Sequence, residues 1–446
     1  MSGEASAPRP PEARPHDARP HEDRREALRL LTAALDRGRA LSEAAADREA
    51  AGLAPATRAR AMTLAAETLR RLGQADAAIK RFARRAPPSP AREALALAAT
   101  EVFALGAPGH AAADGAVEAV KGARGGGRAA GFVNAVARRL VEEGRAAWEA
   151  QDAGRINAPG WLWGRLGSAY GRAGAQRIVE AHLRPAPLDL SVKEDAAGWA
   201  ARLGGEVLPT GSVRLGGAEG FRGRVTALEG FEDGAWWVQD AAAALPARLL
   251  DARPGERVLD LCAAPGGKTM QLAAAGAEVV ALDLAEARLA RLEENLSRTG
   301  LRAELACADA LAWEPRETFD AVLLDAPCSA TGTARRHPDV LRRREAPDVK
   351  GLSALQDALL DRAWDWTAPG GRLVFATCSL LPEEGERRID SFLSDRADAE
   401  LMPVGAAALG VPESWVASGV LRTRPDHWGE RGGVDGFFAA ALRKAV

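Results

Sequence analysis

The chain has 446 residues, of which 47% are apolar and 27% are charged, an ordinary balance for globular domains. With only four cysteines, the composition excludes a disulfide-framework protein, and it also excludes a collagen-like chain and disorder throughout. There is no run of about 18 apolar residues and no apolar core behind the N-terminal charges, so we expect neither a membrane span nor a secretory signal. A reducing cytoplasm is the expected compartment.

The net charge of −2 is the sum of two unequal segments. Residues 26–147 carry 19 basic and 13 acidic side chains, whereas residues 148–446 carry 35 basic and 43 acidic ones. Such asymmetry indicates a partner for the basic segment. The excess of Arg (53) over Lys (six) has a simpler origin in a GC-rich genome, so the signal is weak when taken alone.

Residues 1–25 mix Pro, Arg, His and acidic residues with almost nothing to bury, which predicts a disordered tail. Residues 26–147 are rich in helix formers and are interrupted by Pro and Gly, so five to seven short helices are expected. This segment holds a basic cluster of Lys80, Arg81, Arg84 and Arg85. The cluster is either a solvated helix face or a surface that contacts RNA phosphates.

Residues 148–240 are mixed in character. Trp161, Trp163 and Tyr170 suggest a small helical packing unit, and short Val/Leu runs among glycines between 203 and 228 predict strands and turns. An Ala/Leu helix is expected at about 240–251. We predict a small α/β linker or RNA-binding subdomain here, followed by a further domain over 241–446.

From residue 256 apolar runs alternate with helix-forming segments. The predicted strands are Val258–Leu261, Val279–Leu282, Glu304–Cys307, Phe319–Leu324 and Leu373–Ala376, with helices at about 268–275, 285–298 and 352–367. This alternation predicts a Rossmann-like, doubly wound parallel sheet of the α/β class. Ligands bind at the carboxyl ends of such strands, where this chain has Asp260, Cys262, Asp283, Asp309, Asp325, Cys328 and Cys378.

The segment Ala264–Thr269, which includes Gly267-Lys268-Thr269, partly fits a phosphate-binding P-loop, so a nucleotide hydrolase is an alternative. Cys262 stands where that motif needs its leading glycine. Asp283 suits ribose hydroxyls better, and a crevice lined by carboxylates suits a cationic nucleoside. S-adenosylmethionine, which carries a sulfonium, an amino group and a ribose, fits this description.

Cys328 and Cys378 follow neighbouring predicted strands, so both thiols are expected at one crevice. No Cys-x-x-Cys pair or His cluster supports a zinc site, and we expect no metal. Two thiols, a carboxylate and a methyl donor suggest methylation of a pyrimidine at carbon 5, after a thiolate adds to carbon 6.

These residues resemble a known family. Val258–Thr269, Asp325-Ala326-Pro327-Cys328-Ser329 and Thr377-Cys378-Ser379 look like motifs of the NOL/NOP/Sun family of RNA cytosine-C5 methyltransferases, and more narrowly of its bacterial Sun/Fmu (RsmB-type) small-subunit ribosomal RNA branch. Trp237–Asp240, Arg335–Pro338 and Pro382-Glu383-Glu384 also match. Residues 26–147 resemble a NusB-like RNA-binding domain. One segment, Leu188–Lys193, departs from the family's usual Leu-Arg-Val-Asn.

The resemblance implies roles for individual residues. Cys378 is the implied nucleophile, Cys328 assists product release, and Asp325 touches the cytosine. The implied contacts of S-adenosylmethionine are Cys262, Ala263, Ala264, Pro265, Gly266, Gly267, Lys268, Asp283, Asp309 and Asp325.

We therefore expect methylation of small-subunit ribosomal RNA by a monomeric enzyme that does not engage membranes. The target base must be unstacked to enter the crevice. Arg335, Arg336, His337 and Arg342–Arg344 are expected to line the RNA side or to form a solvated charged helix. A non-catalytic RNA-binding adaptor is a further alternative, which leaves the two-cysteine crevice unexplained.

Overall fold

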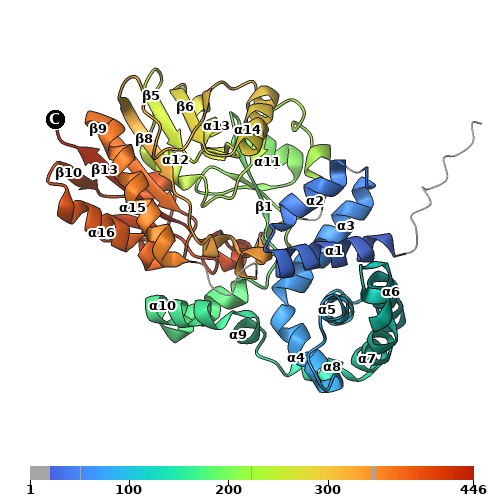
Figure 1. Cartoon of the computed structure of the whole chain (residues 1–446). Helices are drawn as coiled ribbons and strands as arrows, with labels where there is room; N and C mark the ends of the chain where they lie inside the picture. Colours follow the sequence, from blue (N-terminus) through green and yellow to red (C-terminus); the bar gives the residue numbers. More distant parts are fainter. Residues whose placement is uncertain (1–20, 51, 222, 343–347) are drawn as a thin grey trace, which may run out of the picture. The chain divides into compact units, whose positions relative to one another are not determined.

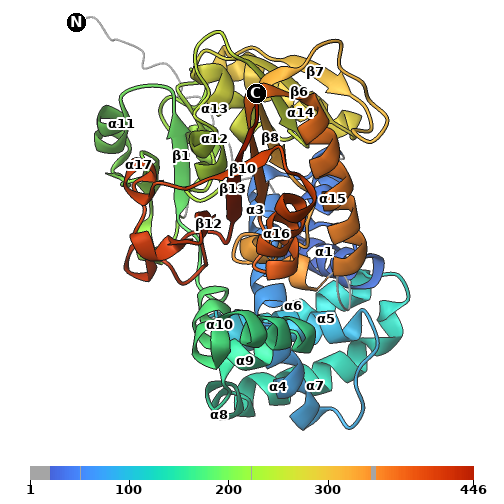
Figure 2. The same ribbon diagram turned by 90° about the vertical axis from the view of Figure 1, so that its left-hand side faces the viewer.

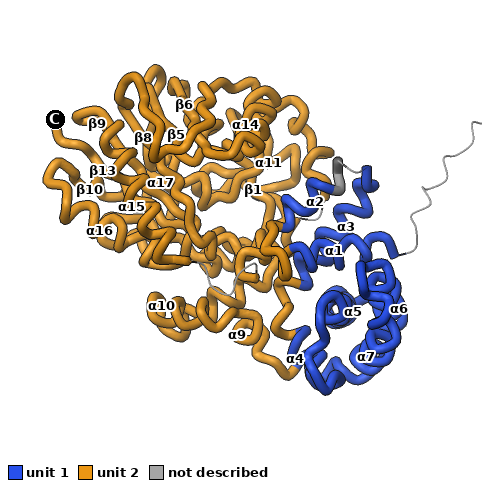
Figure 3. Tube along the Cα trace, in the orientation of Figure 1, with its two compact units in different colours: residues 1–33, 41–68, 75–149 blue, residues 34–40, 69–74, 150–446 orange. Residues whose placement is uncertain are grey.

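The structure is a computed structural model that describes residues 21–446 apart from 51, 222 and 343–347. It divides into two compact units, residues 1–33, 41–68 and 75–149 and residues 34–40, 69–74 and 150–446 (Figure 3). No helix in the described part of the chain is long and apolar enough to cross a membrane.

The first unit is built from helices, as the sequence predicts, although its described residues form eight α-helices where five to seven were expected. Its elements are α1 (Glu22–Arg37), α2 (Leu41–Ala50), α3 (Pro55–Arg70), α4 (Leu72–Phe82), α5 (Ala91–Phe103), α6 (Gly109–Gly122), α7 (Ala130–Glu143) and α8 (Arg145–Glu149), with the ends of α1, α3 and α4 entering the second unit. Helix α5 is buried on nearly all sides and packs against α6 and α7. Its buried Glu101 is neutralised by Arg24, 2.9 Å away. Because α1 begins at Glu22, the expected tail of residues 1–25 is too long by at least four residues, and residues 1–20 lie outside the described residues.

The continuous part of the second unit, residues 150–446, begins with α9 (Ala153–Asn157) and α10 (Gly160–Ala181), which precede a small antiparallel sheet. The sheet has the order β2-β3-β1-β4, formed by β1 (Leu188–Val192), β2 (Glu206–Val207), β3 (Val213–Leu215) and β4 (Trp236–Val238), with α11 (Ala196–Leu203) between β1 and β2. The helix expected at about 240–251 is shorter, α12 (Leu245–Leu250). The preceding residues form a turn, in which the Asp240 side chain accepts a hydrogen bond from the Ala242 backbone N–H.

The main sheet has nine strands in the order β11-β12-β13-β9-β8-β5-β6-β7, with β10 paired to β13 (Figure 1). Its parallel part consists of β5 (Arg257–Leu261), β6 (Glu278–Asp283), β7 (Glu304–Cys307), β8 (Phe319–Asp325) and β9 (Thr367–Thr377). The helices among and after these strands are α13 (Gly267–Ala274), α14 (Glu286–Thr299), α15 (Val349–Trp366), α16 (Glu386–Asp395) and α17 (Ala406–Leu409). The predicted Rossmann-like sheet is therefore confirmed.

Four strands of the main sheet were not predicted from the sequence: β10 (Ala399–Met402), β11 (Val416–Ala417), β12 (Val420–Arg422) and β13 (Phe438–Lys444). They extend the sheet beyond β9 with antiparallel pairings. Strand–helix alternation predicts only parallel strands, so these later strands gave no signal of that kind.

Helices cover both faces of the main sheet. Because side chains alternate along a strand, Leu259 and Val322 pack with α15 and α16, whereas Val258 and Leu323 pack with α12 and α13. Figure 2 shows these helix pairs on opposite sides of the strands. By the same alternation, Asp260 in β5, Asp283 in β6 and Asp325 in β8 lie on the face covered by α12 and α13.

Candidate active site

The loop from Cys262 to Gly266 joins the end of β5 to the start of α13. Cys262 and Gly266 both have positive φ, 60° and 101°. A Cβ on Gly266 would lie 2.0 Å from Leu292, so only glycine fits at that bend. Burial raises the pKa of Cys262 to about 12, so this thiol keeps its proton and is a poor nucleophile.

Asp260 is a buried carboxyl group, and one of its two oxygens has no hydrogen-bond partner among the described residues. Its Oδ2 accepts a hydrogen bond from Thr269 at 2.6 Å, but its Oδ1 has no partner among the described residues. Burial, with the ion Asp325 nearby adding to it, raises the pKa of Asp260 to about 7. Such an orphaned acceptor indicates a missing donor at the end of β5.

Asp283 is the last residue of β6, and Asp309 lies two residues after the end of β7. Asp283 is buried and accepts hydrogen bonds at 3.1 Å from the backbone N–H groups of Ala264 and Ala285, which link its strand to the Cys262 loop. Asp309 is exposed and its Oδ1 accepts from the Leu311 N–H at 2.9 Å. Each acid is followed within two residues by an exposed leucine, Leu284 (71%) and Leu311 (42%), which leaves apolar surface beside carboxylates.

Lys268 and Asp325 form an ion pair at the same edge. Nζ of Lys268 lies 2.7 Å from Oδ2 of Asp325 and 5.2 Å from the centre of the Phe437 ring. Burial alone would lower the pKa of Lys268, but the Asp325 carboxylate raises it above its ordinary value. Lys268 therefore stays charged and holds the Asp325 side chain in place.

The thiols of Cys328 and Cys378 lie together, as their neighbouring strands predict. Their sulfur atoms are 3.4 Å apart, at the ends of the paired strands β8 and β9, and both are free. The hydrogen bond to Cys378, followed by burial, raises the pKa of Cys328 well above its ordinary value. Cys328 is therefore the thiol that keeps its proton.

A buried carboxylate that sequence analysis missed braces both cysteine turns. Glu384 is fully buried and accepts from the backbone N–H of Ser329 at 2.8 Å. Its Oε2 also accepts from the hydroxyls of Ser329 (2.5 Å) and Ser379 (2.6 Å). These two serines directly follow Cys328 and Cys378. The signal available in the sequence is that a serine directly follows each cysteine, whereas Pro382-Glu383-Glu384 by itself indicates only the family resemblance.

The structure corrects the expectation that Arg335 and Arg336 contact RNA. The Arg335 side chain is 1% exposed, and Arg336 pairs with Asp240 at 2.6 Å and with Asp435 at 3.2 Å. Burial and internal pairing leave these guanidinium groups unable to reach RNA phosphates, so we assign them a structural role.

The other predicted RNA contacts differ in accessibility. His337 is exposed and stays a prediction, while Arg342 donates to the backbone oxygens of Leu69 and Asn157. Arg343 and Arg344 lie outside the described residues. In the first unit all four members of the α4 basic cluster are exposed at the end of α4 and just beyond it: Lys80, Arg81, Arg84 and Arg85. They have no ion-pair partner in the described parts of the chain, which leaves the RNA-binding interpretation open.

The strand ends fit S-adenosylmethionine on three observations. The unmet Asp260 Oδ1 can accept from an ammonium group, Asp283 and Asp309 offer acceptors for hydroxyls, and exposed Leu284 and Leu311 offer apolar surface to an adenine. No phosphate cradle with the leading glycine of a P-loop is present in this loop, where Cys262 takes its place. Among the described residues no group of three or more His, Cys, Asp or Glu side chains could hold a metal.

Comparison with known proteins agrees with this site. Residues 247–443 match the family model described as 16S rRNA methyltransferase RsmB/F, and residues 21–142 match that of the NusB family. The ribosomal RNA small subunit methyltransferase B of Xanthomonas campestris pv. campestris is 39% identical over 441 residues, covering 94% of this chain and 96% of the relative.

Solved structures share the fold. The crystal structure of PH0851 superposes with a TM-score of 0.74 at 23% identity, covering 95% of this chain and 99% of that one. A methyltransferase homologue from Pyrococcus horikoshii is 31% identical with a TM-score of 0.52, covering 63% of this chain and 93% of that one. The chain belongs to the RsmB/F family of 16S rRNA methyltransferases, joined to a domain of the NusB family.

Proposed function

We propose that the protein methylates carbon 5 of a cytosine in small-subunit ribosomal RNA, with S-adenosylmethionine as the methyl donor. The observation that carries the proposal is the pair of thiols, 3.4 Å apart, at the strand ends that also hold the Lys268–Asp325 ion pair. The relatives named as rRNA methyltransferases support ribosomal RNA as the substrate. The expected cytoplasmic location and monomeric state stay predictions.

The donor would be held by Cys262–Lys268, Asp283, Asp309 and Asp325, to which we add Asp260. It supplies an electrophilic methyl group and leaves as a neutral thioether. The carbon-5 position of cytosine is a poor nucleophile until the Cys378 thiolate adds to carbon 6. Asp325, fixed by Lys268, stabilises the adduct through a hydrogen bond near ring nitrogen 3.

Release requires a base for the proton on carbon 5. Cys328 is protonated at the start because its pKa is raised, first of all by its hydrogen bond to Cys378. Once the Cys378 sulfur is bonded to carbon 6 it is a neutral thioether, so this first cause is removed, and Cys328 gives its proton to solvent water. The Cys328 thiolate then takes the carbon-5 proton, the ring double bond re-forms, and the Cys378 thiolate leaves.

The test uses full-length protein, labelled S-adenosylmethionine and unmodified small-subunit ribosomal RNA. We expect Cys378→Ala to give no labelled RNA and Cys328→Ala to accumulate a covalent RNA–protein adduct that survives denaturation. The exposed Cys307 provides a matched control, and Cys307→Ala should behave like the wild type. Label transfer by Cys378→Ala would refute the nucleophile assignment, while the absence of an adduct with Cys328→Ala would refute its role in release.

The domain boundaries are part of the proposal. The small antiparallel sheet supports a separate subdomain within residues 148–240, and the main sheet lies within 241–446. We propose that residues 26–147, through the α4 basic cluster, hold the RNA by its phosphates.

A further inference from the structure

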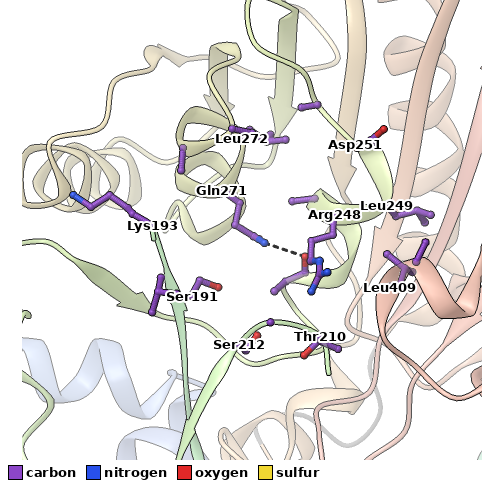
Figure 4. Close-up of a pocket in the computed structure, with 18 of the residues that line it drawn as sticks. Ser191, Lys193, Thr210, Ser212, Arg248, Leu249, Asp251, Gln271, Leu272 and Leu409 are labelled. Atoms are coloured by element: carbon purple, nitrogen blue, oxygen red, sulfur yellow. Dashed lines mark hydrogen bonds between the residues drawn. The ribbon is translucent and has the colours of Figure 1, made fainter. Parts of the chain in front are cut away.

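A cavity of about 710 Å³ lies in the second unit and is lined by residues other than those assigned to the donor and the thiols. Its wall comes from β1, the turn at Thr210–Ser212, α12, α13 and α17 (Figure 4). Neither cysteine of the reacting pair lines it, and none of the proposed donor contacts does. Pockets of several hundred Å³ are typical of sites for small molecules and nucleotides.

Part of the cavity wall is apolar. It is formed by Ala244, Ala247, Leu249, Leu272, Ala275 and Leu409. Two polar side chains on the wall already have partners: Ser191 donates to Gln239, and Gln271 donates to the Ala244 carbonyl. This surface can accept a flat ring or a ribose, but it provides little to hold a charge.

The remaining polar groups have unmet hydrogen-bonding capacity. Thr210 is 2% exposed and its hydroxyl has no partner among the described residues. The Ser212 hydroxyl and the Arg248 guanidinium likewise have no hydrogen-bond or ion-pair partner in the part of the chain that the structure describes. Two other charged residues on the wall are engaged, Lys193 with the Thr299 carbonyl and Asp251 with Arg253.

The turn is shaped around the guanidinium group. Gly211 has φ 81°, and a Cβ placed there would lie 3.2 Å from Nη1 of Arg248. The chain therefore passes close to Arg248 with a residue that leaves room for it. A guanidinium group beside two unpartnered hydroxyls is a donor set without an acceptor, and it matches the oxygens of a phosphate.

We propose that this cavity binds a phosphate ester, a nucleotide unit of the RNA strand outside the target cytosine. Its phosphate binds Arg248, Thr210 and Ser212, and its ring or ribose rests on the apolar wall. The choice of RNA rests on the proposed function. The recognised strand is single-stranded at this point, since a base that is paired in a duplex cannot lay its ring against the apolar wall.

The first test measures binding of unmodified small-subunit ribosomal RNA to the full-length protein, without donor, across a salt series. Arg248→Gln is expected to weaken binding about tenfold and to reduce the slope of log affinity against log salt by about 0.7 to 1. Arg248→Lys should restore most of the slope, and Thr210→Val should weaken binding without changing the slope. The matched control is Arg302→Gln, at an exposed arginine before β7.

The second test titrates adenosine 5′-monophosphate and inorganic phosphate by calorimetry. If the wild type binds the nucleotide and Arg248→Gln does not, the phosphate site is supported. If Arg248→Gln loses nucleotide binding but binds RNA as the wild type does, the cavity belongs to free nucleotides and the proposal for RNA is refuted. If Arg248→Gln alters neither nucleotide nor RNA binding, the site is refuted. Methylation of RNA by the wild type is scored separately, so failure of the proposed function is distinguishable from failure of this site.

Discussion

Replacing Glu384 by Gln tests whether one carboxylate positions both thiols. The side chain is fully buried, and its Oε2 accepts from two serine hydroxyls, one in each cysteine turn. Glutamine has the same shape but presents an NH₂ group in place of one acceptor oxygen. With the amide nitrogen at the Oε2 position, the bond from the Ser329 N–H to Oε1 survives, whereas the two hydroxyls lose their shared anion.

The cost can be worked from these contacts. A hydrogen bond to a charged group contributes roughly 1.5–3 kcal/mol, and the serine hydroxyls can rotate to accept from the new amide, which recovers part of the loss. We therefore expect a decrease of about 2–3 kcal/mol in the free energy of unfolding of the second unit. Because a misplacement of about 1 Å in a reacting group costs on the order of 100-fold in rate, kcat should fall about 100-fold.

The assay combines steady-state methylation kinetics with urea unfolding followed by tryptophan fluorescence. Ten of the eleven tryptophans lie in the second unit, so the fluorescence reports on it. KM for RNA should stay within threefold of the wild type, and adduct formation in a Cys328→Ala background should slow in step with kcat. Glu383→Gln is the neighbouring control, since Glu383 is partly exposed and pairs with Arg165 instead. A destabilised Glu384→Gln protein with normal kcat would show that Glu384 supports the fold alone.

Three other predictions follow from charged side chains, two of them for buried groups and one for an exposed cluster. Burial raises the pKa of Asp260 from its ordinary 3.8 to about 7, so its contribution to the free energy of unfolding is full below pH 3.8 and is lost as the pH rises through 7. Because the ionised carboxylate is the form that binds the donor's ammonium group, donor affinity should rise about tenfold from pH 6 to pH 8. Asp260→Asn should flatten that pH profile in calorimetry. Arg336→Gln leaves the buried carboxylates of Asp240 and Asp435 only their longer contacts to Arg335, at 3.9 and 3.6 Å, and should cost about 3 kcal/mol of unfolding free energy, while the salt dependence of RNA binding stays unchanged. Changing all four residues of the α4 basic cluster to Gln should do the reverse, lowering RNA affinity and its salt slope without lowering the unfolding midpoint.

The parallel core of the sheet was predictable because each strand is a short apolar run that ends in a polar or thiol side chain. Register then brings Cys328 and Cys378 together, since β8 and β9 are neighbours. The antiparallel strands gave no such pattern. β13 reads as an Ala-rich run that ends in charged residues, and only its pairing with β9 identifies it as a strand.

Burial of charge is what the sequence could not reveal. Glu384 sits in a Pro-Glu-Glu segment that is typical of an exposed helix start, yet it is fully buried while the adjacent Glu383 is partly exposed. Its hydrogen-bond partners are Ser329, which is 55 residues away, and Ser379, which is five residues away. The two serines lie after the ends of different strands. Local composition does not predict that Glu384 is buried between these turns, and only the serine after each cysteine gives a signal.

The same limit applies to reading partners from net charge. The acidic balance of residues 148–446 counts carboxylates that are neutralised within the protein and never face a ligand. The internal pairs join Asp189 to Arg214 at 2.7 Å, with both side chains fully buried, and Asp240 and Asp435 to Arg335 and Arg336. Three arginines that would count toward an RNA-binding surface are thus removed from it, together with three acids. A basic residue is evidence for an RNA contact only where it is exposed and lacks an internal partner, which favours the α4 basic cluster and Arg248 over the arginines that the motif first suggested.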